Sequence, residues 1–429
     1  MKQMHEDRRA RLMAHIGSGV AVLATAPEAI RNADTHYPYR SDSYFWYLTG
    51  FGEPGAVLVL DATNNKSILF CRAKDPEREV WDGFRYGPEG AKQEFGFDEA
   101  YLIDELDQRM PDILAGQPEV HWPVGRNAAF DVRVSGWLDA LRARFRTGVE
   151  VPTRFVDVLA QLDEMRIVKD EYEIGILRRA GKISAEAHVR AMQATHPGMN
   201  EYQIEAEILH TFIRQGARFP SYESIVAGGA NACTLHYVGN NHRLNEGELL
   251  LIDAGCELNG YAGDITRTFP ISGKFSAAQR DVYEIVLAAE LAAIETLRPG
   301  ARLNEPGDAA LRVLAQGMVD LKLLTGTVDG IIESEAYRQF YMHGVGHMIG
   351  LDVHDVGKRK VDGEWREFKP GMCTTIEPGL YIRPADNVPP ALANIGIRIE
   401  DDVLITRDGR EIYTAEVPKR IDDIEALMA

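Results

Sequence analysis

Cysteine is scarce in this chain. Four cysteines occur in 429 residues, and none of them forms a CxxC pair. This pattern favours free, buried thiols in a reducing compartment. No long apolar run follows the charged start of the chain either, because the stretch at residues 20–24 is too short for a signal peptide or a membrane span. Both features predict a cytoplasmic protein that does not bind a membrane.

Basic residues are also in the minority. Lys and Arg number 47 against 65 Asp and Glu, which gives a formal net charge of −18. Nucleic-acid binding requires basic patches, so this balance argues against such a partner. It is compatible with a cytosolic enzyme in which bound metal cancels part of the acidity. A length of 429 residues predicts two domains.

The chain changes character after about residue 150. Before that point, short apolar strands alternate with helical stretches, which predicts an α/β domain over residues 1–155. Residues 165–429 instead contain two copies of one order: a helix, Pro-Gly, a second helix, a histidine segment and two acid-bearing strands. Asp170 to Glu173 is a capping signature for the first long helix. The repeat predicts a single domain of two pseudo-symmetric halves.

An aromatic block at residues 37–47 lies between the first two predicted strands. It has two interpretations: packing in the core and turns, or an interface or substrate rim. Asp34, just before the block, is either a solvated loop acid or a residue that reaches the cleft of a neighbouring subunit.

Two acid-bearing stretches echo each other. Residues 247–255 and 371–379 both read Gly, five mostly apolar residues, a carboxylate, any residue and Gly, with Asp253 and Glu377 as the acids. Each is followed by another acid on an apolar strand, Asp264 in one half and Glu400 in the other. Buried unpaired charges cost several kcal/mol, so bound cations would explain the pattern. Four converging carboxylates predict a binuclear metal site.

The turn at Asn259-Gly260 supports this convergence. It is a strong hairpin signal between the segments 249–256 and 261–271. With these two residues as the loop, Asp253 lies opposite Thr266. Asp264 then points to the same face as Asp253, because side chains alternate along a strand. Arg398 and Glu400 share a face for the same reason.

Histidines lie near both acid pairs. His343, His347 and His354 occur in one glycine-rich stretch, and His236 occupies the matching place in the first half. The HExxH motif is absent, and the glycines favour an irregular backbone over a helix. Taken singly, each histidine is also compatible with a core role. One histidine among four carboxylates is an oxygen-rich set that suits Mn²⁺, or Co²⁺ and Fe²⁺.

These motifs strongly resemble the pita-bread metallopeptidases, and among them the bacterial aminopeptidase P (Xaa-Pro aminopeptidase) family. The resemblance rests on four segments of the second domain and on two aromatic motifs of the first domain. The segments are 252–256 with 263–269, 343–355, 376–381 and 396–401, and the aromatic motifs are 37–40 and 45–51. It implies an α/β amino-terminal domain, for oligomerisation or gating, followed by a pita-bread catalytic domain.

The resemblance also implies a site and a reaction. The metal ligands would be Asp253, Asp264, His347, Glu377 and Glu400, holding two divalent ions per chain, with Mn²⁺ the best match. A hydroxide between the ions would attack the bond before proline in peptides with proline in second position. The remaining roles are also assigned by residue. Glu377, His236 and His354 would be catalytic, and His343, Tyr381 and Arg398 would bind substrate, with a plain structural ion pair as the alternative for Arg398.

Rival interpretations remain at this stage. Prolidase shares the metal set but cleaves Xaa-Pro dipeptides, and methionine aminopeptidase usually lacks the amino-terminal domain. A non-catalytic peptide-binding scaffold is a third possibility, which the intact ligand set disfavours. The resemblance further implies a homodimer or homotetramer.

Overall fold

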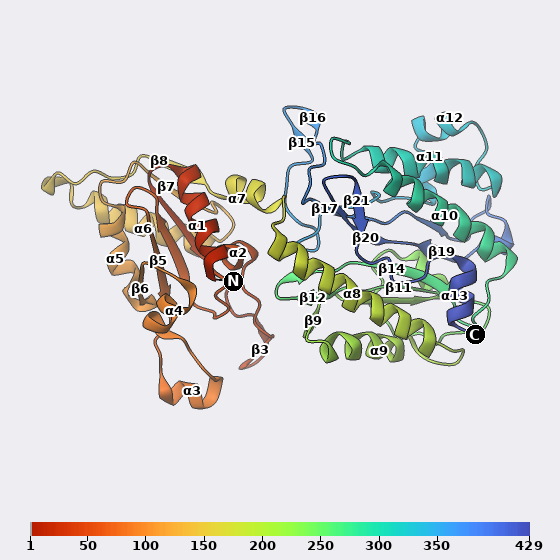
Figure 1. Cartoon of the computed structure of the whole chain (residues 1–429), viewed down its shortest axis with the longest axis horizontal. Coiled ribbons are helices and arrows are strands. Elements are labelled where there is room, and N and C mark those ends of the chain that lie inside the picture. Colours follow the sequence, from red (N-terminus) through yellow and green to blue (C-terminus); the bar gives the residue numbers. More distant parts are fainter. Residues whose placement is uncertain (1) are drawn as a thin grey trace. The chain divides into compact units, whose positions relative to one another are not determined.

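A computed structural model describes residues 2–429 and divides the chain between Met165 and Arg166 into two compact units (Figure 1). The predicted stretches 1–155 and 165–429 left residues 156–164 unassigned. These residues fall in the amino-terminal unit, where β8 (Arg154–Asp157) adds a strand to its sheet and α7 (Leu159–Arg166) runs up to the boundary. Each unit is described by itself.

The amino-terminal unit is built on a six-stranded mixed sheet in the order β6-β5-β4-β1-β7-β8. Strand β4 pairs antiparallel with β1 and β5, whereas the outer pairs β5–β6, β1–β7 and β7–β8 are parallel. The other strands of the sheet are β1 (Val20–Ala24), β4 (Val57–Asp61), β5 (Lys66–Cys71), β6 (Glu99–Leu102) and β7 (Glu119–Trp122). A short hairpin, β2 (Ile30–Asn32) and β3 (Thr35–His36), stands apart from it.

Helices complete this unit. They are α1 (Lys2–Ile16), α2 (Ser43–Thr49), α3 (Pro76–Asp82), α4 (Gly87–Phe95), α5 (Leu106–Leu114) and α6 (Ala128–Arg142). Strand residues such as Val22 and Phe70 form one buried core with Met110 of α5 and Trp137 of α6. Alternating strands and helices around this core confirm the predicted α/β class.

The aromatic block divides between its two interpretations. Its second half forms α2, capped by the carboxylate of Asp42, and buries Tyr44, Phe45 and Tyr47 in the core. Its first residue, Tyr37, stays exposed. Core packing therefore explains the second half of the block.

Two helix pairs frame the carboxy-terminal unit. Helices α8 (Glu171–Ala194) and α9 (Glu201–Arg214) lie on one side of its strands, and α10 (Ala277–Thr296) and α11 (Glu305–Asp320) lie on the other (Figure 1). Reciprocal capping boxes begin α8, α9 and α10, at Asp170, Asn200 and Ser276. The capping signature predicted for the first long helix is confirmed. Two short helices, α12 (Val328–Glu333) and α13 (Ile421–Leu427), complete the set.

Short antiparallel sheets lie between the helix pairs. They are β10-β11-β14, β13-β12-β9, β17-β20-β21 and β18-β19, and a further hairpin, β15-β16, projects at the edge of the unit (Figure 1). Their strands in the first half are β9 (Phe219–Pro220), β10 (Ile225–Gly228), β11 (Leu249–Asp253), β12 (Cys256–Leu258), β13 (Tyr261–Ala262) and β14 (Thr266–Pro270). In the second half they are β15 (Lys360–Val361), β16 (Glu364–Trp365), β17 (Cys373–Ile376), β18 (Gly379–Ile382), β19 (Ile395–Arg398), β20 (Asp401–Ile405) and β21 (Arg410–Ile412).

The hairpin at Asn259-Gly260 has the predicted register, with Asp253 opposite Thr266. The strands are interrupted, however, where one continuous pair was expected. A Cβ on Gly255 would lie 1.7 Å from the carbonyl oxygen of Gly263, so the two backbones approach too closely for a regular ladder with side chains. Asp264 falls in this interruption, two residues before the start of β14.

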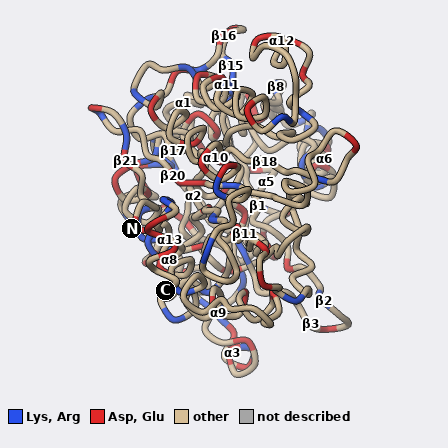
Figure 2. The backbone as a smooth tube through the Cα atoms, turned by 90° about the vertical axis from the view of Figure 1, so that its right-hand side faces the viewer, with Lys and Arg blue, Asp and Glu red and all other residues tan. Residues whose placement is uncertain are grey.

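Acidic and basic residues are interspersed along the backbone (Figure 2). Among residues 2–429, no helix combines the length and the apolar character needed to cross a membrane.

Candidate active site

The four predicted carboxylates meet in the carboxy-terminal unit. Asp253 ends β11, Asp264 precedes β14, Glu377 follows β17 and Glu400 connects β19 to β20. All four line one cleft of about 670 Å³. The two halves join directly behind it, since the amide of Glu400 donates a hydrogen bond to the carbonyl of Thr266 over 3.1 Å.

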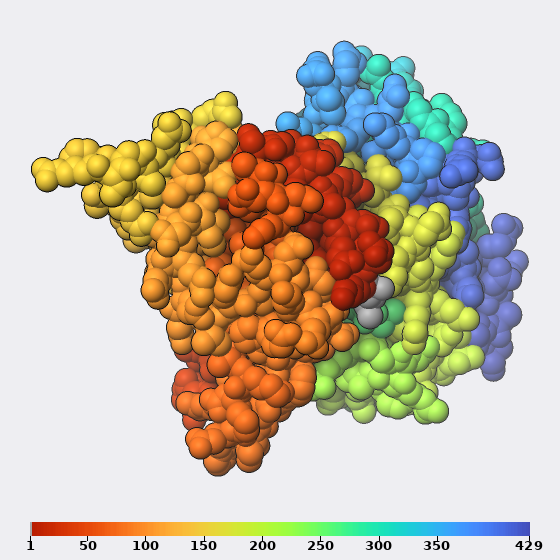
Figure 3. Space-filling model, turned by 60° about the vertical axis from the view of Figure 1, so that its left-hand side comes forward, coloured from red at the N-terminus to blue at the C-terminus, as the bar shows by residue number. Residues whose placement is uncertain are grey.

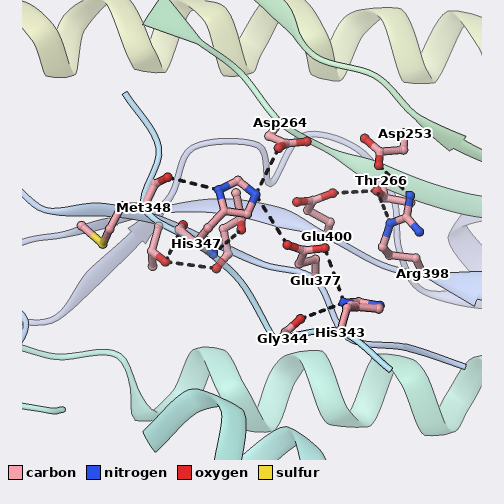
Figure 4. Close-up of polar contacts among 12 residues, drawn as sticks. Asp253, Asp264, Thr266, His343, Gly344, His347, Met348, Glu377, Arg398 and Glu400 are labelled. Carbon is pink, nitrogen blue, oxygen red and sulfur yellow. Dashed lines mark hydrogen bonds and ion pairs between the residues drawn. The ribbon is translucent and has the colours of Figure 1, made fainter. Parts of the chain in front are cut away.

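His347 lies among these acids (Figure 4). Its Nε2 is 3.5 Å from Asp264 Oδ2 and 3.5 Å from Glu377 Oε1. Potential ligand atoms of Asp264, His347 and Glu400 all lie within 4.8 Å of one another. One ion could therefore contact all three residues.

The backbone fixes His347 beside Glu377. Residues 345–349 run along β17. The amide of Glu377 donates a 2.7 Å hydrogen bond to the carbonyl of Val345, and the amide of Thr375 donates a 2.9 Å hydrogen bond to the carbonyl of His347. This approach requires glycine at 346, where a Cβ would lie 2.0 Å from the Thr375 carbonyl oxygen. The segment is irregular rather than helical, as the glycines predicted.

The tautomer of His347 suits a metal ligand. Its Nδ1 lies 3.1 Å from the carbonyl oxygen of Met348. A carbonyl only accepts, so Nδ1 carries the proton and donates. Nε2 therefore faces the carboxylates and is the nitrogen that a metal would bind in place of a proton, which is the second-sphere arrangement common for metal-bound histidines.

The protonation energetics also fit a cation. Burial raises the pKa of Asp264 and of Glu400, and it raises that of Glu377 to about 7. Burial would lower the pKa of His347, but Asp264 and Glu377 outweigh it and raise the pKa to about 9. The clustered acids therefore retain protons, or a protonated His347, in place of the positive charge that divalent ions would bring. The donor set fits such ions.

Tyr222 is a site residue that the sequence did not reveal. Its hydroxyl lies 2.5 Å from Oδ1 of Asp253 and 2.5 Å from Oδ1 of Asp264. It precedes β10 and belongs to neither acid motif, so no local pattern marked it. It links two of the carboxylates that would hold the ions.

Arg398 borders the cleft although it is almost wholly buried, whereas Tyr381 lies behind the cleft wall. The guanidinium of Arg398, 3% exposed, donates to Asp253 Oδ2 over 2.6 Å and to the Tyr381 hydroxyl over 3.0 Å. Tyr381 is fully buried. Its hydroxyl is 2.8 Å from His343 Nε2, while His343 Nδ1 is 2.8 Å from the carbonyl of Gly344. Nδ1 therefore donates to that carbonyl, and the Tyr381 hydroxyl donates to Nε2.

His343 is neutral in this chain of hydrogen bonds. Burial and the charge of Arg398 lower its pKa to about 4. The ring also lines the cleft. The chain of hydrogen bonds thus connects a cleft-facing imidazole, through Tyr381 and Arg398, to Asp253.

His236 and His354 line the same cleft and are exposed to solvent. The rings of His354 and His347 are 4.2 Å apart between centroids, at an interplanar angle of 64°. Burial and nearby His347 lower the pKa of His354. Neither imidazole belongs to the compact three-residue cluster, so both are accessible to a bound peptide.

A second layer of charges lies behind the carboxylates. Arg267 is completely buried and donates to the Glu400 carbonyl over 2.6 Å and to Asp401 over 2.8 Å. Asp402 accepts a 3.0 Å hydrogen bond from the amide of Asp264. These contacts hold the segments that carry two of the acids, and only tertiary structure discloses them.

Known proteins share this architecture over the full chain. Residues 175–407 match metallopeptidase family M24, and residues 5–121 match the amino-terminal domain of aminopeptidase P. Xaa-Pro aminopeptidases of Haemophilus influenzae and Escherichia coli are 48% and 47% identical, over 100% of this chain and 97% and 98% of theirs. The chain belongs to family M24.

Solved M24 structures agree with the fold. Aminopeptidase PepP of Pseudomonas aeruginosa superimposes with a TM-score of 0.98 at 46% identity, covering 100% of this chain and 98% of that one. A variant of E. coli aminopeptidase P in complex with substrate gives 0.97 at the same identity and coverage. The predicted α/β domain followed by a pita-bread catalytic domain is confirmed. So is the predicted enzyme class, the Xaa-Pro aminopeptidases, and prolidase is not favoured.

Proposed function

We propose that this M24 chain releases the amino-terminal residue from peptides with proline in second position. The observation that carries the proposal is the similarity to Xaa-Pro aminopeptidases over the whole of both units. The cleft supports a hydrolytic reaction, because it gathers carboxylates, imidazoles and a metal-compatible cluster in one cavity.

The proposed cofactor is a pair of divalent ions, with Mn²⁺ best suited to an oxygen-rich donor set. Asp253, Asp264, His347, Glu377 and Glu400 would hold them. Bound ions supply a Lewis acid for the scissile carbonyl and an activated water. Hydrogen bonds from Tyr222 and Arg398 hold the carboxylate of Asp253 in its orientation, so it needs little rearrangement when the ions bind.

The remaining roles follow from position and proton affinity. Glu377 is the proposed proton acceptor, because a carboxylate that holds the ions would lie beside the activated water. His236 and His354 would donate hydrogen bonds to substrate oxygen as negative charge develops. His343 would contact substrate from the cleft wall, whereas Tyr381 and Arg398 would act as positioning residues behind it.

Three peptides test the specificity. Ala-Pro-Ala should be cleaved in the presence of Mn²⁺ to alanine and Pro-Ala, with Ala-Ala-Ala a poor substrate. Ala-Pro should also be hydrolysed poorly. Rapid hydrolysis of the dipeptide alone would make the chain a prolidase, and equal cleavage of Ala-Ala-Ala would remove the proline requirement.

The proposed assembly is a homodimer or homotetramer built by the amino-terminal unit, which would restrict access to short peptides. Helix α3 supports this role, because it protrudes from that unit (Figures 1 and 3), and Val80 and Trp81 of the helix and Phe84 just after it are at least 67% exposed. Large exposed apolar side chains are typical of interfaces. Asp34, exposed at the tip of the β2–β3 hairpin, is proposed to reach a neighbouring cleft.

Light scattering tests the assembly. It should give the mass of an oligomer, and substituting serine for Val80, Trp81 and Phe84 should weaken the association. A monomer with full activity at nanomolar concentration would contradict a catalytic role for the oligomer. The proposed location is the cytoplasm, supported by four free and buried cysteines.

A further inference from the structure

Two arginines line the active-site cleft, and only one of them forms an ion pair with a carboxylate of the chain. Arg398 is buried and bound to Asp253. Arg359 is exposed, and it forms no ion pair with any residue of the described chain. Its guanidinium carbon lies 6.0 Å from the centroid of the Trp365 ring, a weak cation–π contact that leaves the N–H donors available to a ligand in a cleft lined by carboxylates.

The backbone that carries the Arg359 side chain is held by hydrogen bonds. Arg359 immediately precedes the β15–β16 hairpin, and its carbonyl accepts a 2.9 Å hydrogen bond from the amide of Arg366. The guanidinium of Arg366, itself buried, donates over 2.6 Å to the neighbouring carbonyl of Lys358. The hairpin thus presents the Arg359 side chain from a fixed base, which lowers the entropic cost of using it.

Arg359 lies where the cleft continues past His347. It lines both the main cleft and a smaller cavity of about 160 Å³, and the two cavities share Gly346 and His347 as well. Val353 and His354, a few residues earlier in the chain, line the main cleft with it. Its side chain therefore borders the route by which a peptide would extend beyond the carboxylates.

The substrate supplies a matching charge. An aminopeptidase holds the amino end of its peptide at the reacting centre, so in a short peptide the terminal carboxylate follows within a few residues, at roughly 3.4 Å per residue. A cavity of about 670 Å³ can bury most of a ligand of that size. The acids of the cleft repel such a carboxylate, whereas a guanidinium binds it in a two-pronged hydrogen-bonded pair.

We propose that Arg359 binds the carboxylate of short peptide substrates beyond the proline, and so makes the enzyme selective for short peptides with a free carboxyl end. This inference rests on the proposed Xaa-Pro aminopeptidase function. A carboxylate side chain at the same place in a longer peptide offers the same chemistry.

Kinetics on paired peptides test the proposal. For Arg359→Gln, kcat/KM on Ala-Pro-Ala should fall about fivefold, the upper range for an exposed ion pair, mainly through KM. The amide Ala-Pro-Ala-NH₂ lacks the charge and should be cleaved equally by wild type and variant. Lys360→Gln is the matched control, since Lys360 carries the same charge one residue away but does not line the cleft.

Further experiments distinguish a terminal carboxylate from a side-chain carboxylate, and a failure of the Arg359 proposal from a failure of the proposed function. A loss on Ala-Pro-Asp-NH₂ as well would extend the site to side-chain carboxylates, whereas a loss on Ala-Pro-Ala alone would assign it to the terminal carboxylate. Calorimetric binding of Pro-Ala and its amide should give the same contrast without turnover. Equal losses on all peptides, or none, would overturn the role of Arg359 only. Failure of the wild type on every proline peptide would overturn the proposed function too.

Discussion

The hydroxyl of Tyr222 has an unusual position for a single polar group, because it contacts two carboxylates of the candidate metal site. Burial raises the pKa of Tyr222 well above its ordinary value, and Asp253 and Asp264 raise it further, so the phenol stays protonated and neutral. It can then orient the two acids by donating to one and packing against the other.

Replacement of this hydroxyl should damage metal binding. Tyr222→Phe is expected to weaken Mn²⁺ binding or turnover about 10- to 100-fold, the usual range for loss of a group that orients a metal ligand. Tyr261→Phe is the control. The hydroxyl of Tyr261 donates a 3.0 Å hydrogen bond to Glu173, which is not one of the four carboxylates of the candidate metal site. Metal titration and kcat measure the difference. Equal effects of the two substitutions would contradict the orienting role.

The sequence predicted the acidic residues of the site but not the residues whose hydrogen bonds hold them in place. Asp253 and Glu377 were found because each ends an apolar run with the same glycine spacing, which is a local signal. Tyr222, Arg267 and Asp402 act through contacts to residues distant in the chain, such as the 3.0 Å bond from the Asp264 amide to Asp402. No spacing rule encodes such contacts.

Among the secondary-structure elements, the pairing of residues 345–349 with β17 decides where His347 lies. Gly346 is tightly enclosed in this pairing, whereas a Cβ on Gly344 would meet nothing within 4 Å. The two glycines therefore offer a matched pair of alanine substitutions in one segment.

Gly346→Ala should displace His347 and lower kcat about 100-fold, because small misplacements of reacting groups carry costs of that order. Gly344→Ala should retain most of the activity. Metal content and kcat of the two variants provide the measurement. If Gly344→Ala were as inactive as Gly346→Ala, steric exclusion at Thr375 would not be the cause.

Local sequence patterns predicted helix starts and turns correctly, but they did not predict where a strand is interrupted. The capping signature at Asp170 and the turn at Asn259-Gly260 were correct because both depend on a few adjacent residues. The break after Asp253 was missed, since it arises from the close approach of Gly255 to the backbone at Gly263, nearby in space but across the hairpin.

For the whole molecule, acid stability should be limited by buried neutral histidines, which both units contain. Burial lowers the pKa of His5 and of His188 to about 4. Nε2 of His188 donates to the carbonyl of Ala254 over 3.0 Å, and no described residue bonds its Nδ1. A second proton on His188 would therefore be buried without an acceptor.

The sign of the pH effect follows. The unfolded chain binds the proton near pH 6.5 and the folded chain near pH 4, so the stabilising contribution is complete above about 6.5 and is lost as pH falls towards 4. For His188 the loss is about 3 kcal/mol. Denaturant melts of wild type and His188→Gln between pH 7 and 4 should show a shallower decline in the variant. If the free energy of unfolding fell equally with pH in both proteins, His188 would not be a source of the acid sensitivity.

The central claim is that the carboxylate cluster of the carboxy-terminal unit holds two divalent ions on which hydrolysis depends. Its most direct test is a titration of chelator-treated protein with Mn²⁺, following bound metal and Ala-Pro-Ala hydrolysis in the same samples. Activity should rise from zero and reach its plateau as binding approaches two ions per chain, and Asp264→Ala, still folded, should stay inactive throughout. Full activity in metal-free protein, or a plateau at one bound ion or none, would contradict the account.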